Sequence, residues 1–259
     1  MKIFKRNIGY HLLWMCLFFV NCDLERKNPL DPKNPNSNRP VVVVAELFIN
    51  DDMGTAFCDY ALEAVENLSQ PYYEQLVVVE YHLPYRTSTD QFISQSFVPV
   101  YQDYVRPGEP QGLPHIFING TSHQIQGASS VRTVQDRCEM AIITELDKKS
   151  YLTIEASLSK VSSNFNITGK IARLGDEDIS NIEIKAVLIE DIQQAKHHFV
   201  ARSLFTEQTI SFIKHSEIKD FQLSTTASNF LREDLVRAVI FVQKIQNKQT
   251  LGAISIPLD

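Results

Sequence analysis

The chain has 259 residues and a net charge of −6, with 25 Lys and Arg residues against 31 Asp and Glu residues. This acidic balance, without a basic stripe, argues against nucleic acid as a partner. Four cysteines are too few for a disulfide-stapled scaffold, so the fold must depend on a hydrophobic core, and the length allows two domains.

The N-terminus has the pattern of an export signal. Three basic residues, Lys2, Lys5 and Arg6, precede an apolar run over residues 8–20. The run is shorter than the about 20 apolar residues that a membrane-spanning helix needs. A basic start followed by a short apolar core is typical of a secretory signal peptide, which we predict over residues 1–21.

Cys22 directly follows the apolar core and is the predicted lipidation site. The tract Phe19-Val20-Asn21-Cys22 resembles the lipobox of bacterial lipoproteins, in which the cysteine is acylated and becomes the first mature residue. Two acyl chains give stable membrane anchoring. Asn21 replaces the small residue usual in that motif, so an ordinary secreted protein and an uncleaved anchor remain alternatives. Residues 22–40 contain four prolines among polar residues and are expected to form a flexible tether.

The next segments predict a parallel pair of strands joined by a helix. Residues 41–48 and 76–81 are apolar, β-branched runs typical of strands buried on both faces. Between them, residues 56–68 carry apolar side chains at helical spacing. Strand, helix and strand in this order predict a βαβ unit.

Residues 82–149 are expected to add two helices and a hairpin. Apolar residues recur at roughly helical intervals within residues 82–111. Asn119-Gly120, between two short apolar runs, is a strong hairpin signal. Ser129 or Ser130 can cap a final helix that extends to about Lys148.

The hydrophobic pattern changes its period near Ser150. Beyond this residue, apolar and polar residues alternate in several short runs separated by turn signals. This pattern predicts an antiparallel β-sandwich of about seven strands. The change of period predicts a domain boundary, with one domain over residues 41–149 and another over residues 150–259.

The order of elements predicted for residues 41–149 resembles that of thioredoxin. Gly112-Leu113-Pro114, followed by residues 116–120, resembles the loop whose proline is cis and faces the active site. Residues 58–61 resemble the second active-site cysteine and the helix after it. The resemblance implies an α/β thioredoxin-like domain followed by an all-β, immunoglobulin-like sandwich.

The whole chain is also similar to a group of outer-membrane lipoproteins with this domain pairing. Residues 187–191 and 240–243, together with His197-His198, carry the likeness in the second half. The resemblance implies a location in the cell envelope, with the outer membrane as the anchoring membrane. The side of the membrane that the protein faces stays open.

The thiol pair of a disulfide exchanger is missing. Exchange needs an attacking and a resolving thiol. If Cys58 is the second cysteine of the motif, Thr55 holds the first position, and on a shifted alignment Met53 holds it. The CxxC motif is absent on either alignment, so the protein is not predicted to be a dithiol oxidoreductase.

Cys58 leaves a second hypothesis open. Thr55 stands three residues before Cys58, which resembles the peroxiredoxin arrangement in which a threonine and a helix N-terminus activate the thiol. Asp59, however, would raise the thiol pKa by its like charge. A single-cysteine thiol enzyme, peroxiredoxin-like or acting by mixed-disulfide exchange, with Cys58 and Thr55 as catalytic residues, is therefore the alternative. We favour a non-reactive Cys58 that packs as a small apolar residue.

The favoured interpretation is a membrane-anchored binding or assembly module of the cell envelope. Leu113, Pro114 and His115 are the predicted groove residues, and an extended envelope polypeptide is the candidate partner. No cofactor or metal is expected, because the histidines are scattered over strand ends. His197 and His198 are adjacent, so on a strand they would point to opposite faces.

Overall fold

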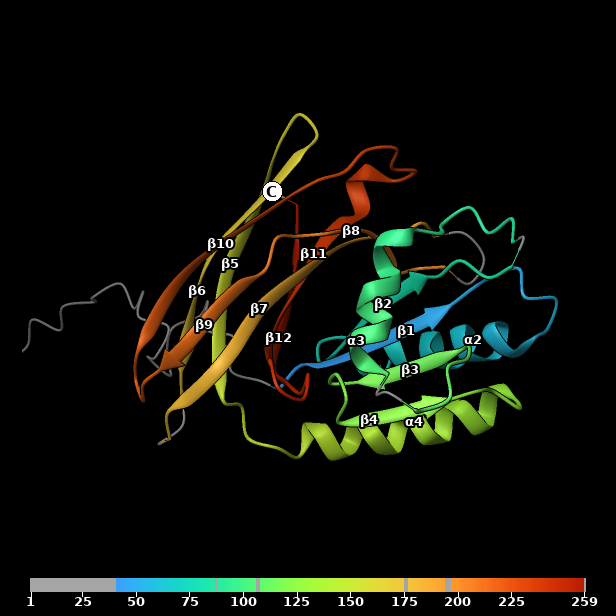
Figure 1. The fold of residues 1–259 in the computed structure, drawn as a ribbon, viewed down its shortest axis with the longest axis horizontal. Coiled ribbons are helices and arrows are strands. Elements are labelled where there is room, and N and C mark those ends of the chain that lie inside the picture. Colours follow the sequence, from blue (N-terminus) through green and yellow to red (C-terminus); the bar gives the residue numbers. More distant parts are fainter. Residues whose placement is uncertain (1–40, 87, 106–107, 175–176, 194–196, 259) are drawn as a thin grey trace, which may run out of the picture.

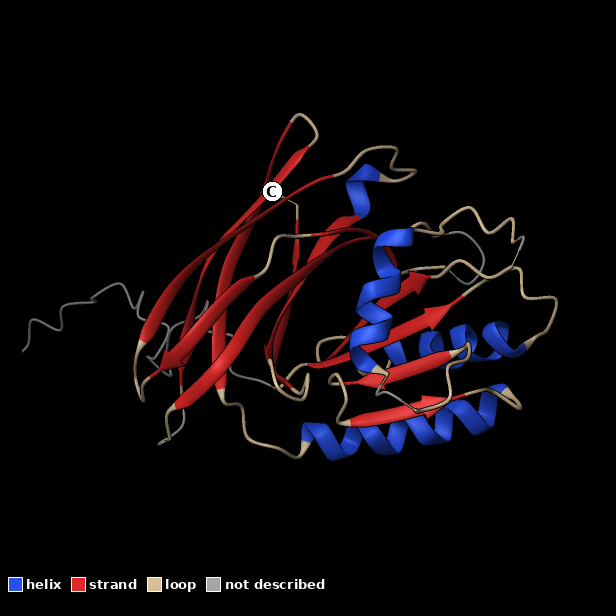
Figure 2. Cartoon of the chain, in the orientation of Figure 1, coloured by secondary structure: helices blue, strands red, loops and turns tan. Residues whose placement is uncertain are grey.

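The computed structural model describes residues 41–258 apart from 87, 106–107, 175–176 and 194–196 (Figures 1 and 2). The predicted signal peptide, the lipidation site Cys22 and the tether lie outside the described residues. Within the described ranges, no helix is long and apolar enough to cross a membrane.

The described part of the first half of the chain, which we take as residues 41–149, contains four strands and three α-helices. These elements are β1 (Val43–Ile49), α2 (Phe57–Ser69), β2 (Leu76–His82), the 3-10 turn η2 (Gln95–Phe97), α3 (Val98–Tyr104), β3 (His115–Ile118), β4 (His123–Gln126) and α4 (Val131–Leu146). Strand β1 pairs in parallel with β2 and antiparallel with β3, which pairs with β4. Because successive side chains of β1 alternate between faces, Ala45 and Leu47 pack against α2 and α4, whereas Val44 and Phe48 pack against α3. Figure 1 shows α3 on the opposite side of this sheet from α2.

The second half consists of strands and one 3-10 turn. These elements are β5 (Leu152–Val161), β6 (Asn164–Arg173), β7 (Ile179–Glu190), β8 (Val200–Leu204), β9 (Gln208–Ile213), β10 (Ile218–Thr226), η3 (Glu233–Leu235), β11 (Val236–Lys244) and β12 (Thr250–Pro257). Strands β10, β6 and β5 form a separate three-stranded antiparallel sheet. The other strands of this half extend the sheet of the first half.

One mixed sheet therefore runs through both halves of the chain. Its strand order is β12-β11-β7-β8-β2-β1-β3-β4, with β9 paired to β7. The two halves meet where Glu80 of β2 pairs in parallel with Val200 of β8, and the Glu80 amide donates a hydrogen bond to the Phe199 carbonyl over 2.9 Å.

The predicted fold class, an α/β thioredoxin-like domain followed by a separate immunoglobulin-like sandwich, is wrong. The described chain contains much more strand than helix, in mixed and antiparallel sheets, and the larger sheet does not stop at Ser150. If the sheet ended with the strands of the first half, β2 would be an edge strand with unpaired backbone groups. Strand β8 of the second half pairs with this edge, so the two halves share one sheet. The domain boundary at residues 149–150 stays a prediction.

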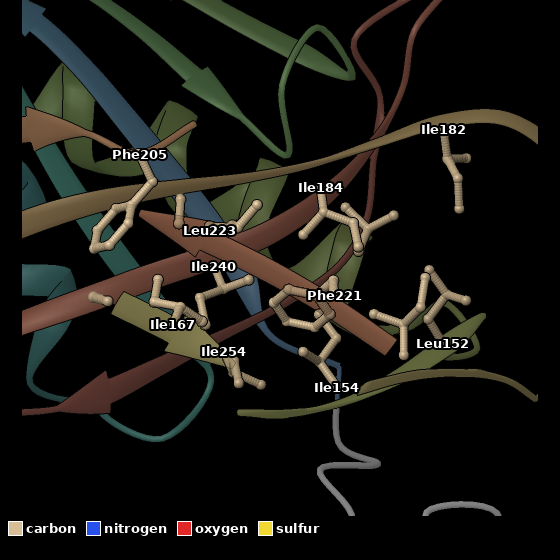
Figure 3. Close-up of a cluster of buried hydrophobic side chains, with 14 of the residues drawn as sticks. Leu152, Ile154, Ile167, Ile182, Ile184, Phe205, Phe221, Leu223, Ile240 and Ile254 are labelled. Atoms are coloured by element: carbon tan, nitrogen blue, oxygen red, sulfur yellow. The ribbon is translucent and has the colours of Figure 1, made fainter. Parts of the chain in front are cut away.

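The hydrophobic core also crosses between the halves. Phe48 stacks on Tyr81 with ring centroids 4.7 Å apart, and both belong to a buried cluster that includes Val187, Val239 and Phe241. Another cluster lies between the two sheets of the second half, where side chains from facing strands interdigitate (Figure 3). Burying each such large apolar side chain stabilises the fold by roughly 1.5–3 kcal/mol, so the shared cluster holds the two halves together.

Candidate functional site

The two residues of the predicted thiol site differ in their exposure. Cys58 is the second residue of α2 and is 2% exposed, with its Sγ 3.4 Å from Met53 Sδ. Its side chain belongs to the core cluster beneath α2 and α4. Thr55 lies exposed in the loop before α2. Reactive cysteines are usually accessible to their substrate, and Cys58 in this conformation is not.

Cys138, the other cysteine of the described chain, is also buried. Cys138 of α4 is 1% exposed, and neither it nor Cys58 is in a disulfide. Burial raises the pKa of the Cys138 thiol to about 12. Burial therefore disfavours the thiolate form of Cys138.

The predicted groove residues lie at the start of β3. The Leu113–Pro114 peptide bond is cis, as the resemblance implies. Leu113 is half-buried, and both Pro114 and His115 are buried. His115 Nδ1 lies 3.2 Å from Tyr101 Oη, and burial lowers the pKa of His115 to about 4. The imidazole of His115 therefore lies in the protein interior. The exposed part of this loop lies before Leu113, at Gln111.

A cluster of ionisable side chains that the sequence did not predict lies at the junction of the two halves. Glu80 and His82 occupy alternate positions of β2 and so point to the same face, and His197 lies just before β8. All three are buried: their exposed fractions are 2%, 0% and 6%. Each offers one potential ligand atom, and these atoms lie within 4.8 Å of one another.

Both imidazoles of this cluster face the same carboxylate oxygen of Glu80. Glu80 Oε2 lies 3.3 Å from His197 Nδ1 and 3.8 Å from His82 Nε2. The other oxygen, Oε1, accepts backbone hydrogen bonds from His198 and Phe199 over 3.2 and 3.1 Å. The carboxylate is thereby fixed with Oε2 facing the two imidazoles.

Two aspartates hold the far sides of the imidazole rings. Asp90 Oδ2 lies 2.7 Å from His82 Nδ1, and Asp51 Oδ2 lies 3.4 Å from His197 Nε2. The Asp51 amide also donates to Asp90 Oδ2 over 2.8 Å, which ties the two loops together. Each imidazole therefore has an aspartate on one nitrogen and faces Glu80 with the other.

The electrostatics favour the charged forms of Glu80, His82 and Asp90. Burial alone would raise the pKa of Glu80, but contacts with His197 and His82 outweigh it and leave the pKa lowered. Burial would also lower the pKa of His82, but Asp90 and Glu80 outweigh it and leave the pKa raised. Despite its own burial, Asp90 has a pKa lowered to about 2 by His82.

The sequence places His82 at a strand end and His197 and His198 on opposite faces of a strand, and it does not indicate Glu80, Asp90 or Asp51 as partners of these histidines. The local signal was the Glu80-Tyr81-His82 alternation at the end of a buried strand, which places two polar side chains on one face. The third member is more than 100 residues further along the chain, so no spacing rule connects it to the other two.

The comparisons with known proteins show a shared fold. No protein-family model matches the sequence, and no curated protein matches it. The structure is similar to HBP35 of Porphyromonas gingivalis over 85% of this chain and 76% of that chain, with a TM-score of 0.65 and 13% identity. It is also similar to a protein from Agrobacterium tumefaciens over 84% of this chain and 95% of that chain, with a TM-score of 0.52 and 20% identity.

A third match is to a domain of the outer membrane lipoprotein Omp28 from Porphyromonas gingivalis. It covers 42% of this chain and 89% of that chain, with a TM-score of 0.34 and 16% identity. The first two matches span most of the chain, so the arrangement in which both halves are joined occurs in other proteins. At these identities the similarity concerns the fold alone.

Proposed function

We propose that the protein is a lipid-anchored, non-catalytic module of the cell envelope that binds another polypeptide. The burial of both thiols of the described chain carries this proposal, because it removes the nucleophile that a thiol enzyme needs. The single-cysteine alternative would need Cys58 to reach a substrate from the core beneath α2.

The membrane attachment in this proposal rests on the sequence. The basic start, the short apolar run and Cys22 directly after it form the export and acylation signal. Acylation would place the folded part close to a membrane surface, with the outer membrane as the proposed location.

The proposed contact surface is the loop that leads into β3. Gln111 is exposed, Gly112 and Leu113 are half-buried, and the chain then enters the sheet at His115. Tyr101 Oη fixes the loop, because it accepts a hydrogen bond from the Gly112 amide over 3.1 Å. An ordered loop beside a sheet can bind an extended polypeptide by backbone pairing, with little entropy cost to the loop itself.

Site-specific crosslinking in intact cells tests the binding role. A photo-crosslinking amino acid at the exposed Gln111 is expected to give a discrete protein adduct, whereas the same group at Ser157, exposed on β5, is the control. Absence of a discrete adduct at 111, or the same adducts from both positions, would contradict the proposed surface.

Metabolic labelling with a fatty-acid analogue tests the anchor separately. The wild-type protein is expected to take up the label and to partition with membranes, and Cys22→Ala is expected to lose both properties. Equal labelling of the two proteins would contradict lipidation at Cys22.

A further inference from the structure

The geometry points to a metal site: we propose that Glu80, His82 and His197 bind one divalent transition-metal ion of the zinc class. This inference is independent of the proposed polypeptide binding, because the three residues lie at the junction of β2 and β8 rather than in the loop that leads into β3.

The spacing of the ligand atoms fits such an ion. Zinc binds imidazole nitrogen and carboxylate oxygen at about 2.1 Å with tetrahedral angles, which puts neighbouring ligand atoms roughly 3.4 Å apart. Glu80 Oε2 lies 3.3 Å from His197 Nδ1 and 3.8 Å from His82 Nε2, and all three ligand atoms lie within 4.8 Å of one another, so binding one ion requires the side chains to rotate towards it. Three protein ligands leave one coordination position for water.

The surroundings of the three ligands have the organisation of a metal site. A metal-bound histidine commonly uses its second nitrogen to hydrogen bond to a carboxylate, which fixes the ring and its tautomer. Asp90 stands in this position for His82, and Asp51 stands there for His197. The backbone amides of His198 and Phe199 orient Glu80 in the same way.

An unsatisfied polar atom points into the cluster. Among the described residues, His82 Nε2 is buried and has no partner within hydrogen-bond distance, since Glu80 Oε2 lies 3.8 Å from it. Buried polar atoms are nearly always paired, and an orphan of this kind calls for an explanation such as a bound ion. A metal ion at this point would displace the proton of Nε2, because a ligating imidazole is neutral, and would neutralise the Glu80 carboxylate.

The donor set selects the class of ion. Two imidazoles and one carboxylate suit zinc and its transition-metal neighbours, whereas Ca²⁺ and Mg²⁺ take oxygen ligands almost exclusively. Phe92 covers the site, with its ring centroid 5.2 Å from that of His82 and 5.5 Å from that of His197. The ion would link β2 of the first half to the segment that precedes β8 of the second half.

Direct metal-binding measurements on the full mature chain test the site. After stripping with a chelator, the wild-type protein is expected to bind one Zn²⁺ per chain and no Ca²⁺ or Mg²⁺. Replacement by Co²⁺ is expected to give the intense visible absorption of a four-coordinate nitrogen and oxygen site. This spectrum needs no variant, so it remains informative even if a substitution prevents folding.

Matched variants then assign the ligands. His82→Ala and His197→Ala are expected to weaken Zn²⁺ binding by more than about 100-fold, and Asp90→Asn by about 10- to 100-fold. His198→Ala is the control, because the His198 ring contacts Glu66 and Asp191 outside the cluster and its backbone amide is unchanged by the substitution. It is expected to bind Zn²⁺ like the wild type.

Substoichiometric binding by the wild type, or a Co²⁺ spectrum typical of the hydrated ion, would overturn the proposal. Wild-type affinity in folded His82→Ala and His197→Ala proteins would overturn it as well, as would loss of the ion in His198→Ala. Crosslinking from Gln111 reports on a different surface, so the two proposals fail separately.

Discussion

Glu46 offers a stability measurement that probes the shared core of the two halves. It lies in β1, is 0% exposed, and accepts hydrogen bonds from Tyr104 Oη over 2.6 Å and Tyr81 Oη over 3.2 Å. Burial raises the pKa of Glu46 from 4.5 to about 7, although both hydrogen bonds and the charge of Lys185 act to lower it. The carboxyl is therefore more basic in the folded protein than in the unfolded chain.

The sign of the pH effect follows from proton uptake. Between pH 4.5 and about 7 the folded state holds a proton on Glu46 that the unfolded state has lost, so the free energy of unfolding falls as the pH rises. This contribution is fully present below pH 4.5 and is lost above the folded pKa. A shift from 4.5 to about 7 corresponds to about 3 kcal/mol at 1.36 kcal/mol per pKa unit.

Glu46→Gln removes this titration while keeping the size of the side chain. The variant is expected to be more stable than the wild type by up to about 3 kcal/mol above the folded pKa, with the difference shrinking towards zero at acid pH. Urea unfolding of both proteins across the pH range measures the difference, with Glu74→Gln, at an exposed position, as the control. An identical pH dependence in wild type and Glu46→Gln would refute the reasoning.

Two further substitutions test the packing of the second half and of the shared core. In Gly169→Ala, the new Cβ would lie 2.5 Å from both the Glu155 carbonyl oxygen and Phe221 Cζ, so we expect a loss of about 1–3 kcal/mol in urea unfolding, and a neutral result would contradict this packing. Phe241 is 2% exposed and belongs to the cluster shared by the two halves, so Phe241→Ala should leave a cavity and lower the free energy of unfolding by about 3–5 kcal/mol. Hydrogen exchange should then show faster opening in β1 as well as β11, and an effect confined to the second half would contradict a shared core.

Local elements could be predicted well from the sequence. The predicted helix over residues 56–68 appears as α2 (Phe57–Ser69), and the strand predicted over residues 76–81 appears as β2 (Leu76–His82). The Asn119-Gly120 signal falls in the turn between β3 and β4, with both residues at positive φ. These features depend on neighbouring residues, so hydrophobic period and turn chemistry reveal them.

The joining of the halves and the buried cluster could not be predicted in this way. Strand β8 pairs with β2 through Glu80 and Val200, and the local sequence pattern of neither strand predicts which strand it pairs with. The same pairing brings His197 to Glu80 and His82, so missing the sheet meant missing the site. Among the described residues, the change of period near Ser150 marks the end of the α-helices, but it does not mark the end of the sheet.

The central claim, binding without thiol chemistry, is tested most directly by the alkylation rate of Cys58 in the folded mature protein. Mass spectrometry of the Cys58 peptide across a range of pH measures this rate, and Ser157→Cys supplies an exposed thiol for comparison. We predict that Cys58 is labelled only after the protein is unfolded, whereas the thiol introduced by Ser157→Cys reacts in the native state. Rapid labelling of native Cys58, with an apparent pKa well below the free value of about 8.5, would contradict the account and favour a thiol enzyme.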